Sequence, residues 1–257
     1  MPASHPDSPE VLHLLGLRLH RAGVEEVHAF IGRTLREKKK ALVLNLNIHC
    51  VNLALKNPWL KDFINQAQWV FCDGDGVRLG LRILGEIPPP KMTYDRWIWE
   101  LGEFCSREGF RLFFLGAKPG IAAEAARRLQ ARFPNLQIAG TNHGYFEKDG
   151  PENDRIIQEI NRGNADILIV GFGMPAQEKW LSENWRKINA HVFLSGGAVF
   201  DYASGQLKRA PAWMIRSHLE WLYRLFREPR RLWKRYGTEI PYFFFRVFRE
   251  KWAKGIK

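Results

Sequence analysis

The sequence predicts an α/β fold with a mainly parallel, layered sheet, followed by a basic, aromatic, helical C-terminal appendage. Over residues 1–204, short apolar runs alternate with amphipathic helical patterns, which is the order of elements in a sheet covered by helices. Residues 205–257 carry 14 Lys and Arg against 4 Asp and Glu, together with 12 Trp, Tyr and Phe. We therefore expect an α/β domain at 1–204 and an appendage at 205–257.

The expected strands are short apolar runs that end at turn-forming residues. They are 14–19, 41–46, 69–72, 111–115, 137–139, 166–170 and 191–194. Between them, a periodicity of 3.6 residues predicts helices. The clearest are 24–38, an Ala-rich stretch that ends at 132, and a segment that begins near 176.

Glycine turns follow four of the expected strands, at 73–74, 116–117, 171–173 and 196–197. In an open parallel sheet such turns meet at the carboxyl edge, where ligands bind and helix N-termini offer amide donors to phosphate. None of them matches the dinucleotide GxGxxG motif or a P-loop, which argues against an ordinary NAD or ATP enzyme. Tight packing explains any single turn, but four together favour a phosphate-bearing ligand.

Composition limits the chemistry further. The three cysteines form no CxxC pair and the eight histidines show no metal-binding spacing, so we expect no disulfide framework, no metal and no other cofactor. The first ten residues lack the basic start and apolar stretch of a signal peptide. We therefore expect a cytoplasmic protein.

The appendage combines positive charge with aromatic side chains. Helices are expected there at 212–226, at 230–236 after an interruption at Pro229, and at 241–254. Packing on the domain is the favoured explanation for the first helix, but in 242–252 aromatics and arginines occupy too many faces for it. Cations among aromatics suit an anionic, partly apolar surface, which is either a bilayer face or nucleic acid.

Two absences separate these partners. No run approaches the ~18 apolar residues of a membrane span, so the appendage could lie on a membrane but not cross it. The sequence also has no RNP, KH-loop or zinc-finger pattern. We therefore expect peripheral attachment to an anionic membrane surface and no nucleic-acid partner.

Asp73 directly follows an expected strand and precedes a glycine, so its carboxylate should stand at the carboxyl edge of the sheet. Two chemical roles fit this position. Asp73 and Asp75 could form a DxD pair that holds a divalent metal against a pyrophosphate. Alternatively, Asp73 alone could act as the general base for an attacking hydroxyl. A plain turn explains an Asp-Gly pair equally well.

Polar side chains follow two further strands. Asn45 and Asn47 point the same way in a strand of period two, so both amides could bind sugar hydroxyls, although Asn47 could equally cap the next helix. The segment 171–180, GFGMPAQEKW, has two glycines that allow a ligand close to the backbone. Gln177 and Glu178 then fall in the first helical turn, near any ligand of the helix N-terminus. Complementing the helix dipole is the other explanation for Glu178.

Taken together, these segments resemble the WecG/TagA/CpsF family of bacterial glycosyltransferases. The resemblance extends from about residue 14 to 236 and rests on DG-x-G, GAKPG, GTNHGYF, ADILIVGFGMPAQEKW and GGAVFDYASGQLKRAPAW, in that order. The family implies a Rossmann-like α/β domain with a C-terminal appendage. It also implies inverting, metal-independent transfer of a sugar from a UDP-sugar to a polyprenyl-diphosphate-linked acceptor at the inner face of the cell membrane. Its members build cell-wall polymers, capsules and exopolysaccharides.

On this resemblance the family's catalytic aspartate falls on Asp73, while Asp75 falls on a variable position, which argues against a metal-binding DxD pair. The residues expected to bind substrate are Asn45, Asn47, Lys91, Gly116, Lys118, Tyr145, Gly171, Gly173, Gln177 and Glu178. The residues expected to hold the acceptor diphosphate are Arg209, Arg216, Arg224 and Arg227.

Two departures from the family pattern lie near the expected sugar pocket. Asn45 stands where the family often has threonine, and Lys91 stands where it often has arginine. The donor sugar is therefore left open between a glucose type and an N-acetylmannosamine type, and the chain is similar here to exopolysaccharide glucosyltransferases of the family. A metal-dependent DxD transferase and a basic nucleic-acid-binding protein are the alternatives. Whether the chain forms a homo-oligomer is left open by the sequence.

Overall fold

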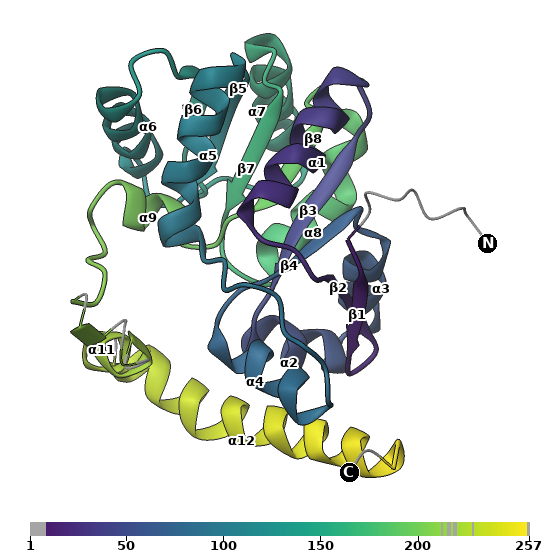
Figure 1. Ribbon diagram of the computed structural model, residues 1–257. Helices are drawn as coiled ribbons and strands as arrows, with labels where there is room; N and C mark the ends of the chain where they lie inside the picture. Colours follow the sequence, from purple (N-terminus) through teal and green to yellow (C-terminus); the bar gives the residue numbers. More distant parts are fainter. Residues whose placement is uncertain (1–8, 212, 215–216, 218–219, 228, 256–257) are drawn as a thin grey trace.

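A six-stranded, entirely parallel sheet forms the centre of the molecule, in the order β4-β3-β8-β7-β5-β6 (Figure 1). The computed structural model describes residues 9–255 except 212, 215–216, 218–219 and 228. The strands are β3 (Ala41–Leu46), β4 (Trp69–Cys72), β5 (Arg111–Gly116), β6 (Gln137–Asn142), β7 (Ile167–Gly171) and β8 (Val192–Ser195). The expected α/β class with a parallel sheet is confirmed.

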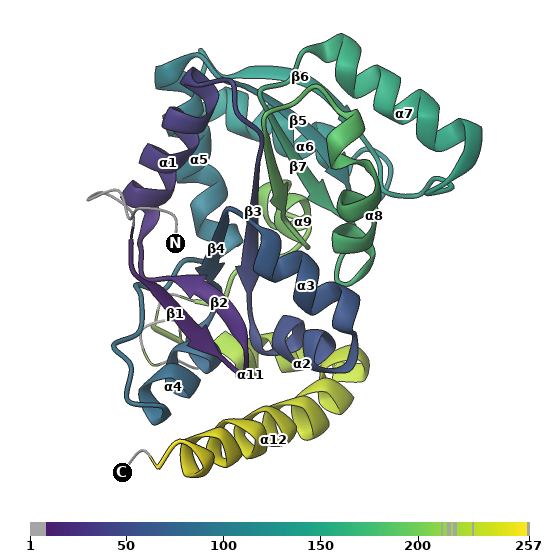
Figure 2. The ribbon, with the colours of Figure 1, turned by 90° about the vertical axis from the view of Figure 1, so that its right-hand side faces the viewer.

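Helices cover both faces of the sheet, and each strand divides its side chains between two apolar clusters. In β7, Leu168 and Val170 join one cluster, whereas Ile167 and Ile169 join the other, because successive residues of a strand point to opposite faces. One face packs against α1 (Val24–Arg36), α5 (Tyr94–Glu108), α6 (Ile121–Arg132) and α9 (Val199–Ala203). The other face packs against α2 (Ile48–Lys56), α3 (Pro58–Gln66), α4 (Asp75–Ile83), α7 (Gly150–Gly163) and α8 (Ala176–Asn184). A short 3-10 helix, η1 (Trp185–Lys187), directly follows α8. Figure 2 shows the sheet between α1 and α5 on one side and α3, α7 and α8 on the other.

The strand order reverses beside β3, which positions a ligand site. From β3 the chain first moves outward to β4, then crosses to β5 on the far side of the sheet, and the last strand, β8, returns between β3 and β7. Ligands of open α/β sheets bind outside the carboxyl ends of the strands at such a reversal. A ligand site is therefore expected at the ends of β3, β4, β7 and β8.

The single strand expected at 14–19 is wrong. This part of the chain is an antiparallel hairpin of β1 (Val11–Leu14) and β2 (Leu17–His20). Leu15 and Gly16 form the turn with positive φ angles of 54° and 76°, the backbone that two-residue hairpin turns require. A leucine rarely adopts this conformation, so the apolar run gave no sign of a turn.

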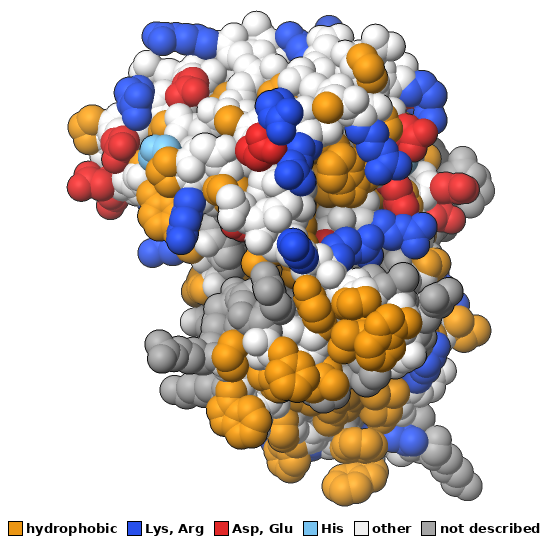
Figure 3. Space-filling model, turned by 90° about the vertical axis from the view of Figure 1, so that its left-hand side faces the viewer, with side chains coloured by type: hydrophobic (Ala, Val, Ile, Leu, Met, Phe, Trp, Pro, Cys, Tyr) orange, Lys and Arg blue, Asp and Glu red, His pale blue; other side chains and the backbone are white. Residues whose placement is uncertain are grey.

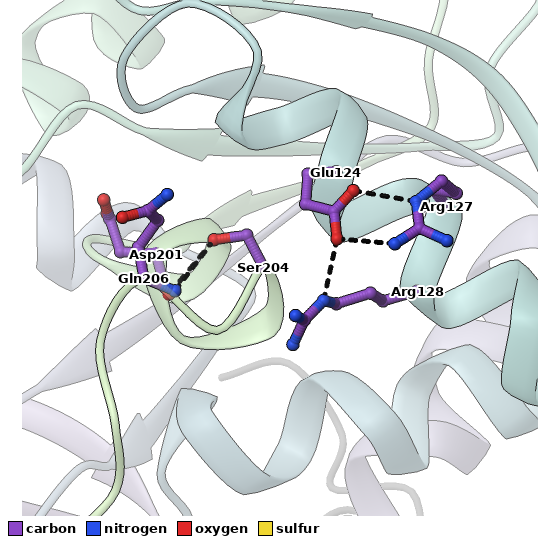
Figure 4. A network of polar contacts seen from close by, with 6 residues as sticks. All are labelled: Glu124, Arg127, Arg128, Asp201, Ser204 and Gln206. Carbon is purple, nitrogen blue, oxygen red and sulfur yellow. Dashed lines mark hydrogen bonds and ion pairs between the residues drawn. The ribbon is translucent and has the colours of Figure 1, made fainter.

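The chain leaves the sheet region through a turn after α9 (Figure 4). The Ser204 hydroxyl accepts a hydrogen bond from the Gln206 backbone N–H at 3.4 Å and donates one to the Asp201 carbonyl at 3.2 Å. Gly205 has a φ of 80°, and a Cβ there would lie 2.3 Å from the Arg128 guanidinium on α6. On the same helix, Glu124 accepts hydrogen bonds from Arg127 and from Arg128.

Beyond this turn lie α11 (Glu220–Arg227) and α12 (Pro229–Ala253). The expected break between 230–236 and 241–254 is wrong, because Pro241 lies inside a continuous α12. Proline lacks an N–H and its ring crowds the carbonyl four residues earlier, which here belongs to Gly237. Both residues are exposed, so water can reach that carbonyl and the helix continues.

One stripe of α12 packs against α2, α4 and the hairpin. Phe243 and Val247 are fully buried, and a Cβ at Gly80 of α4 would lie 2.8 Å from the Phe243 ring. Glu250, one turn further on, accepts a hydrogen bond from the Leu15 backbone N–H at 2.9 Å. Packing on the domain, which the sequence makes the weaker explanation for 242–252, therefore holds for this stripe.

The opposite side of the C-terminal segment exposes large aromatic side chains. Their exposed fractions range from 43% to 79%, and they are Trp213, Phe226, Trp233, Phe245, Phe248 and Trp252. Figure 3 shows hydrophobic side chains gathered over the lower part of the molecule, where α11 and α12 lie. Among the described residues, no helix has both the length and the hydropathy that a membrane crossing needs.

Candidate active site

A pocket of about 260 Å³ opens at the carboxyl ends of β3 and β4. The side chains of Asn45, Asn47 and Asp73 line it, together with the first residues of α2 and α5. The turns after β7 and β8 complete the wall with Gly173 and Gly197. Three of the four glycine turns that the sequence marks therefore border this pocket, while the turn at 116–117 does not.

The Asp73 carboxylate is held from the neighbouring strand. Its Oδ2 accepts hydrogen bonds from the Asn45 amide at 2.8 Å and from the Asn47 amide at 3.3 Å. Asn45 in turn accepts a hydrogen bond from the Ser195 hydroxyl of β8 at 3.1 Å. The Asn47 oxygen caps α2 by accepting from the Cys50 N–H at 3.0 Å. The capping role of Asn47 is thus confirmed, and its NH2 group orients Asp73, whereas its predicted contact with sugar hydroxyls stays a prediction.

Asp75 has different partners. Its carboxylate forms ion pairs with Arg78 at 3.1 Å and with Lys91 at 2.9 Å. Lys91 therefore contacts Asp75, and it lines a neighbouring hollow beside α1 and α5 instead of the pocket around Asp73. Within the described part of the chain, no three His, Cys, Asp or Glu side chains gather closely enough to hold a metal ion.

Gln177 and Glu178 lie behind the pocket wall. Gln177 is fully buried, and its Oε1 accepts from the backbone N–H groups of Gly173 at 3.2 Å and Gly197 at 2.9 Å. Its Nε2 donates to Glu178 Oε1 at 2.7 Å. Gln177 therefore connects the two turns that line the pocket. Neither side chain reaches the lining, so the predicted substrate contacts of this pair are not seen directly.

Glu178 is 1% exposed, and no described residue forms a hydrogen bond with its Oε2. Burial raises its pKa from 4.5 to about 7, against the opposing effect of the Gln177 hydrogen bond. Removing a carboxylate from water disfavours its charged form. The wall of the pocket therefore contains an acid that titrates near neutral pH.

Four other residues expected to bind substrate lie outside this pocket. Gly116 and Gly171 allow close backbone packing, since a Cβ at Gly116 would lie 2.4 Å from the Gly171 carbonyl, and one at Gly171 would lie 2.7 Å from the Gly197 carbonyl. Lys118 and Tyr145 are exposed side chains. Their predicted contacts with substrate stay predictions.

Of the four arginines expected to hold the acceptor diphosphate, only Arg209 has a side chain that the structure describes. Arg209 forms an ion pair with Asp95, a nearly buried pocket residue in the first turn of α5. Arg216 lies outside the described residues. Arg224 and Arg227 belong to α11, but their side chains also lie outside what the structure describes.

Sequence reasoning missed several pocket residues. Tyr94 and Asp95 line the pocket from α5, but no strand or glycine turn precedes them, so no sequence pattern marks them as site residues. The Tyr94 hydroxyl is buried and has no hydrogen-bond partner among the residues that the structure describes. Burial, together with the nearby Asp73 and Glu178, raises its pKa well above the ordinary value. His49 could have been found, because it lies two residues after Asn47 in the first turn of α2.

Comparisons with known proteins point in one direction. The model of the family described as "Glycosyl transferase WecG/TagA/CpsF family" matches residues 12–257. The chain is 30% identical over 215 residues to the N-acetylglucosaminyldiphosphoundecaprenol N-acetyl-beta-D-mannosaminyltransferase of Bacillus subtilis (strain 168), covering 84% of this chain and 82% of that protein. It is 27% identical over 230 residues to the protein of the same name from Staphylococcus aureus (strain MW2), covering 89% and 87%.

Proposed function

Because this chain belongs to the WecG/TagA/CpsF family of glycosyl transferases, we propose that it transfers a hexose from a UDP-sugar to an acceptor sugar on a polyprenyl diphosphate. The chain is a hexosyltransferase. The named relatives transfer N-acetylmannosamine to N-acetylglucosaminyldiphosphoundecaprenol, which favours an N-acetylmannosamine donor over the glucose type. The observation that carries the proposal is the Asp73 carboxylate, which lines the pocket with one oxygen held by two amides.

The proposed reaction is a single displacement without a metal ion. Asp73 takes the proton of an acceptor hydroxyl while that oxygen forms a bond to the anomeric carbon of the donor. The bond from this carbon to UDP breaks on the opposite face, so the configuration is inverted and UDP leaves. The hydrogen bonds from Asn45 and Asn47 hold the base in one orientation, and such positioned bases contribute roughly 100- to 10,000-fold to the rate.

Charge that develops on the leaving diphosphate needs a separate source of stabilisation. The Gly173 and Gly197 N–H groups are already bonded to Gln177, so these two amides are not available for it. The N-termini of α2 and α5 border the pocket instead, and helix N-termini favour negative charge. Arg209 lies beside α5 in an ion pair with Asp95, and in this proposal its guanidinium also donates to the diphosphate.

In this proposal the C-terminal segment brings the enzyme to its acceptor. The α/β domain at 1–204, joined by Arg209, performs the transfer, while the rest of 205–257 attaches the enzyme peripherally to the inner face of the cell membrane, where the lipid-linked acceptor resides. The exposed aromatics from Trp213 to Trp252 and the excess of Lys and Arg support it, because apolar burial and attraction to anionic lipid act together. The product would be part of a cell-wall polymer, capsule or exopolysaccharide.

A donor screen tests the proposal. Release of UDP would be measured from UDP-N-acetylmannosamine, UDP-glucose and UDP-galactose, with and without an N-acetylglucosaminyl-diphospho-lipid acceptor. We expect acceptor-dependent release from one donor, N-acetylmannosamine first, with full activity in EDTA. Failure of all three donors with this acceptor would contradict the proposal, whereas activity that EDTA abolishes and Mn²⁺ restores would favour the metal-dependent alternative.

A further inference from the structure

A histidine of the pocket is bonded to a carboxylate of the C-terminal helix. His49 Nδ1 lies 2.9 Å from both carboxylate oxygens of Glu239. His49 comes from the first turn of α2 and lines the pocket with Asp73, whereas Glu239 comes from α12. Residues 190 positions apart in the chain therefore meet at the edge of the proposed active site.

The position of Glu239 is fixed by its surroundings. Its backbone carbonyl accepts a hydrogen bond from the Asn52 side chain at 2.8 Å, and Asn52 is 3% exposed. Glu239 also begins the stripe that continues with Phe243 and Val247, both fully buried. Each step along this stripe is four residues, so the three side chains share one face of the helix. The carboxylate therefore reaches His49 from a helix that is packed on the domain.

The pair fixes the orientation of the imidazole ring. The side chains of His49 and Glu239 are each 23% exposed, so the contact is partly shielded from water. A carboxylate can only accept, which places a proton on Nδ1. The same carboxylate stabilises the imidazolium form, in which both ring nitrogens donate. In the imidazolium form the ring is an oriented cationic donor at the rim of the pocket, which suits an anionic ligand such as a diphosphate.

We propose that His49 binds a substrate diphosphate in this pocket and that Glu239 is the positioning residue that orients its ring. The proposal rests on the proposed glycosyl transfer and deepens it. The diphosphate belongs either to the nucleotide donor or to the lipid-linked acceptor, since both carry the same group. α12 would then contribute to the active site through a carboxylate that never touches substrate.

The test compares variants of the full-length protein. His49→Ala should weaken binding of one diphosphate substrate by roughly 10- to 100-fold, the usual contribution of a charge-assisted hydrogen bond. Glu239→Ala should weaken the same binding step by a smaller factor. Glu239→Gln, which keeps an acceptor for Nδ1, should recover part of the loss. KM and kcat for donor and acceptor, with calorimetric binding of UDP and of a short-chain lipid diphosphate, show which substrate is affected.

Glu250→Gln is the matched control. Glu250 lies on the same helix and also fastens it to the domain, through the Leu15 backbone, but it does not line the pocket. We expect Glu250→Gln to leave both binding constants unchanged. The double variant His49→Ala/Glu239→Ala should be no weaker than His49→Ala alone, because Glu239 acts only through His49.

Three outcomes would overturn the inference. They are unchanged binding of both diphosphates in His49→Ala, additive losses in the double variant, and a Glu250→Gln loss as large as that of Glu239→Ala. The calorimetric comparison does not require turnover, so it separates this inference from the proposed function. If the wild-type protein transferred no sugar but bound a diphosphate through His49, only the proposed function would fail.

Discussion

The pocket at the sheet edge and the outer face of the C-terminal segment differ in the side chains that they bury and expose. In and behind the pocket wall, polar groups are buried or half-buried and bonded to one another, as in the contacts of Asn45 with Asp73 and of Gln177 with Gly173. On the outer face of α12, large apolar groups such as Trp233 and Trp252 are about three-quarters exposed. Pre-arranged polar atoms suit chemistry, and exposed aromatics suit contact with another apolar surface.

One helix, α12, belongs to both regions through its two sides. The inner stripe of α12 holds Phe243 and Val247 in the core and Glu239 against His49. Its outer side carries Phe245 and Trp252 into solvent. Removing the whole segment would therefore uncover part of the core together with the outer face. Point substitutions distinguish the two regions more cleanly than truncation does.

The largest effect should come from Asp73 in the pocket. Asp73→Asn should lower turnover roughly 100- to 10,000-fold, because the base is lost, while donor binding stays largely intact. Asp75→Asn is the control, since Asp75 forms partly exposed ion pairs with Arg78 and Lys91, and it should change turnover less than about fivefold. Steady-state rates of UDP release compare the two. Equal losses in both variants would remove the distinct role of Asp73.

Gln177 tests whether the pocket wall depends on buried hydrogen bonds. Gln177→Leu should lower the free energy of unfolding by at least about 2 kcal/mol, because it leaves the Gly173 and Gly197 N–H groups without their acceptor. Urea unfolding measures this change. If stability were unchanged and only the donor KM rose, Gln177 would contact the ligand directly, as the sequence predicts.

Glu178 gives the wall a pH dependence. Its folded pKa of about 7 is raised above the ordinary 4.5 by burial, so between these values the folded protein keeps a proton that the unfolded chain releases. This contribution to stability is fully present below pH 4.5 and is lost as the pH rises through 7, by at most about 3 kcal/mol. Glu178→Gln should remove it. Unfolding free energies of the wild-type protein and of Glu178→Gln, measured from pH 4.5 to 8, would show whether only the wild type loses this stability. Parallel curves for the two proteins would refute the pH dependence assigned to Glu178.

The outer aromatic face should give the smallest effect. Changing Trp233, Phe245 and Trp252 together to serine should weaken binding to anionic vesicles at least about tenfold, because apolar area is lost from the membrane contact. The inner stripe stays intact, so thermal stability should barely change. Vesicle co-sedimentation measures the binding. Undiminished binding by this variant would place the membrane contact elsewhere.

Much of the sheet could be predicted from the sequence because its strands are isolated apolar runs. Strands 41–46 and 69–72 lie where the sequence places them, since each is buried along its whole length and followed by polar residues. The hairpin at 11–20 could not be predicted, because its turn uses a leucine with positive φ. The continuous α12 could not either, since the tolerance of Pro241 depends on which side of the helix meets water.

The site was predictable where it lies at strand ends. Asn45, Asn47 and Asp73 converge because the ends of parallel neighbours share one edge of the sheet. The depth of Gln177 could not be predicted, since the sequence places it in the first turn of α8 without fixing the rotation of that helix. The His49–Glu239 pair depends on how α12 docks, a contact between segments far apart in the chain that no local pattern encodes.

The central claim is that chemistry resides in the sheet-edge pocket and that the outer aromatic face only brings the enzyme to its acceptor. Its most direct test is sugar transfer to two acceptors, a short soluble lipid diphosphate and its long-chain form in anionic vesicles. Asp73→Asn should lose transfer to both, whereas the triple aromatic variant should lose transfer only in vesicles. Loss of soluble transfer by the aromatic variant, or its retention by Asp73→Asn, would contradict the claim.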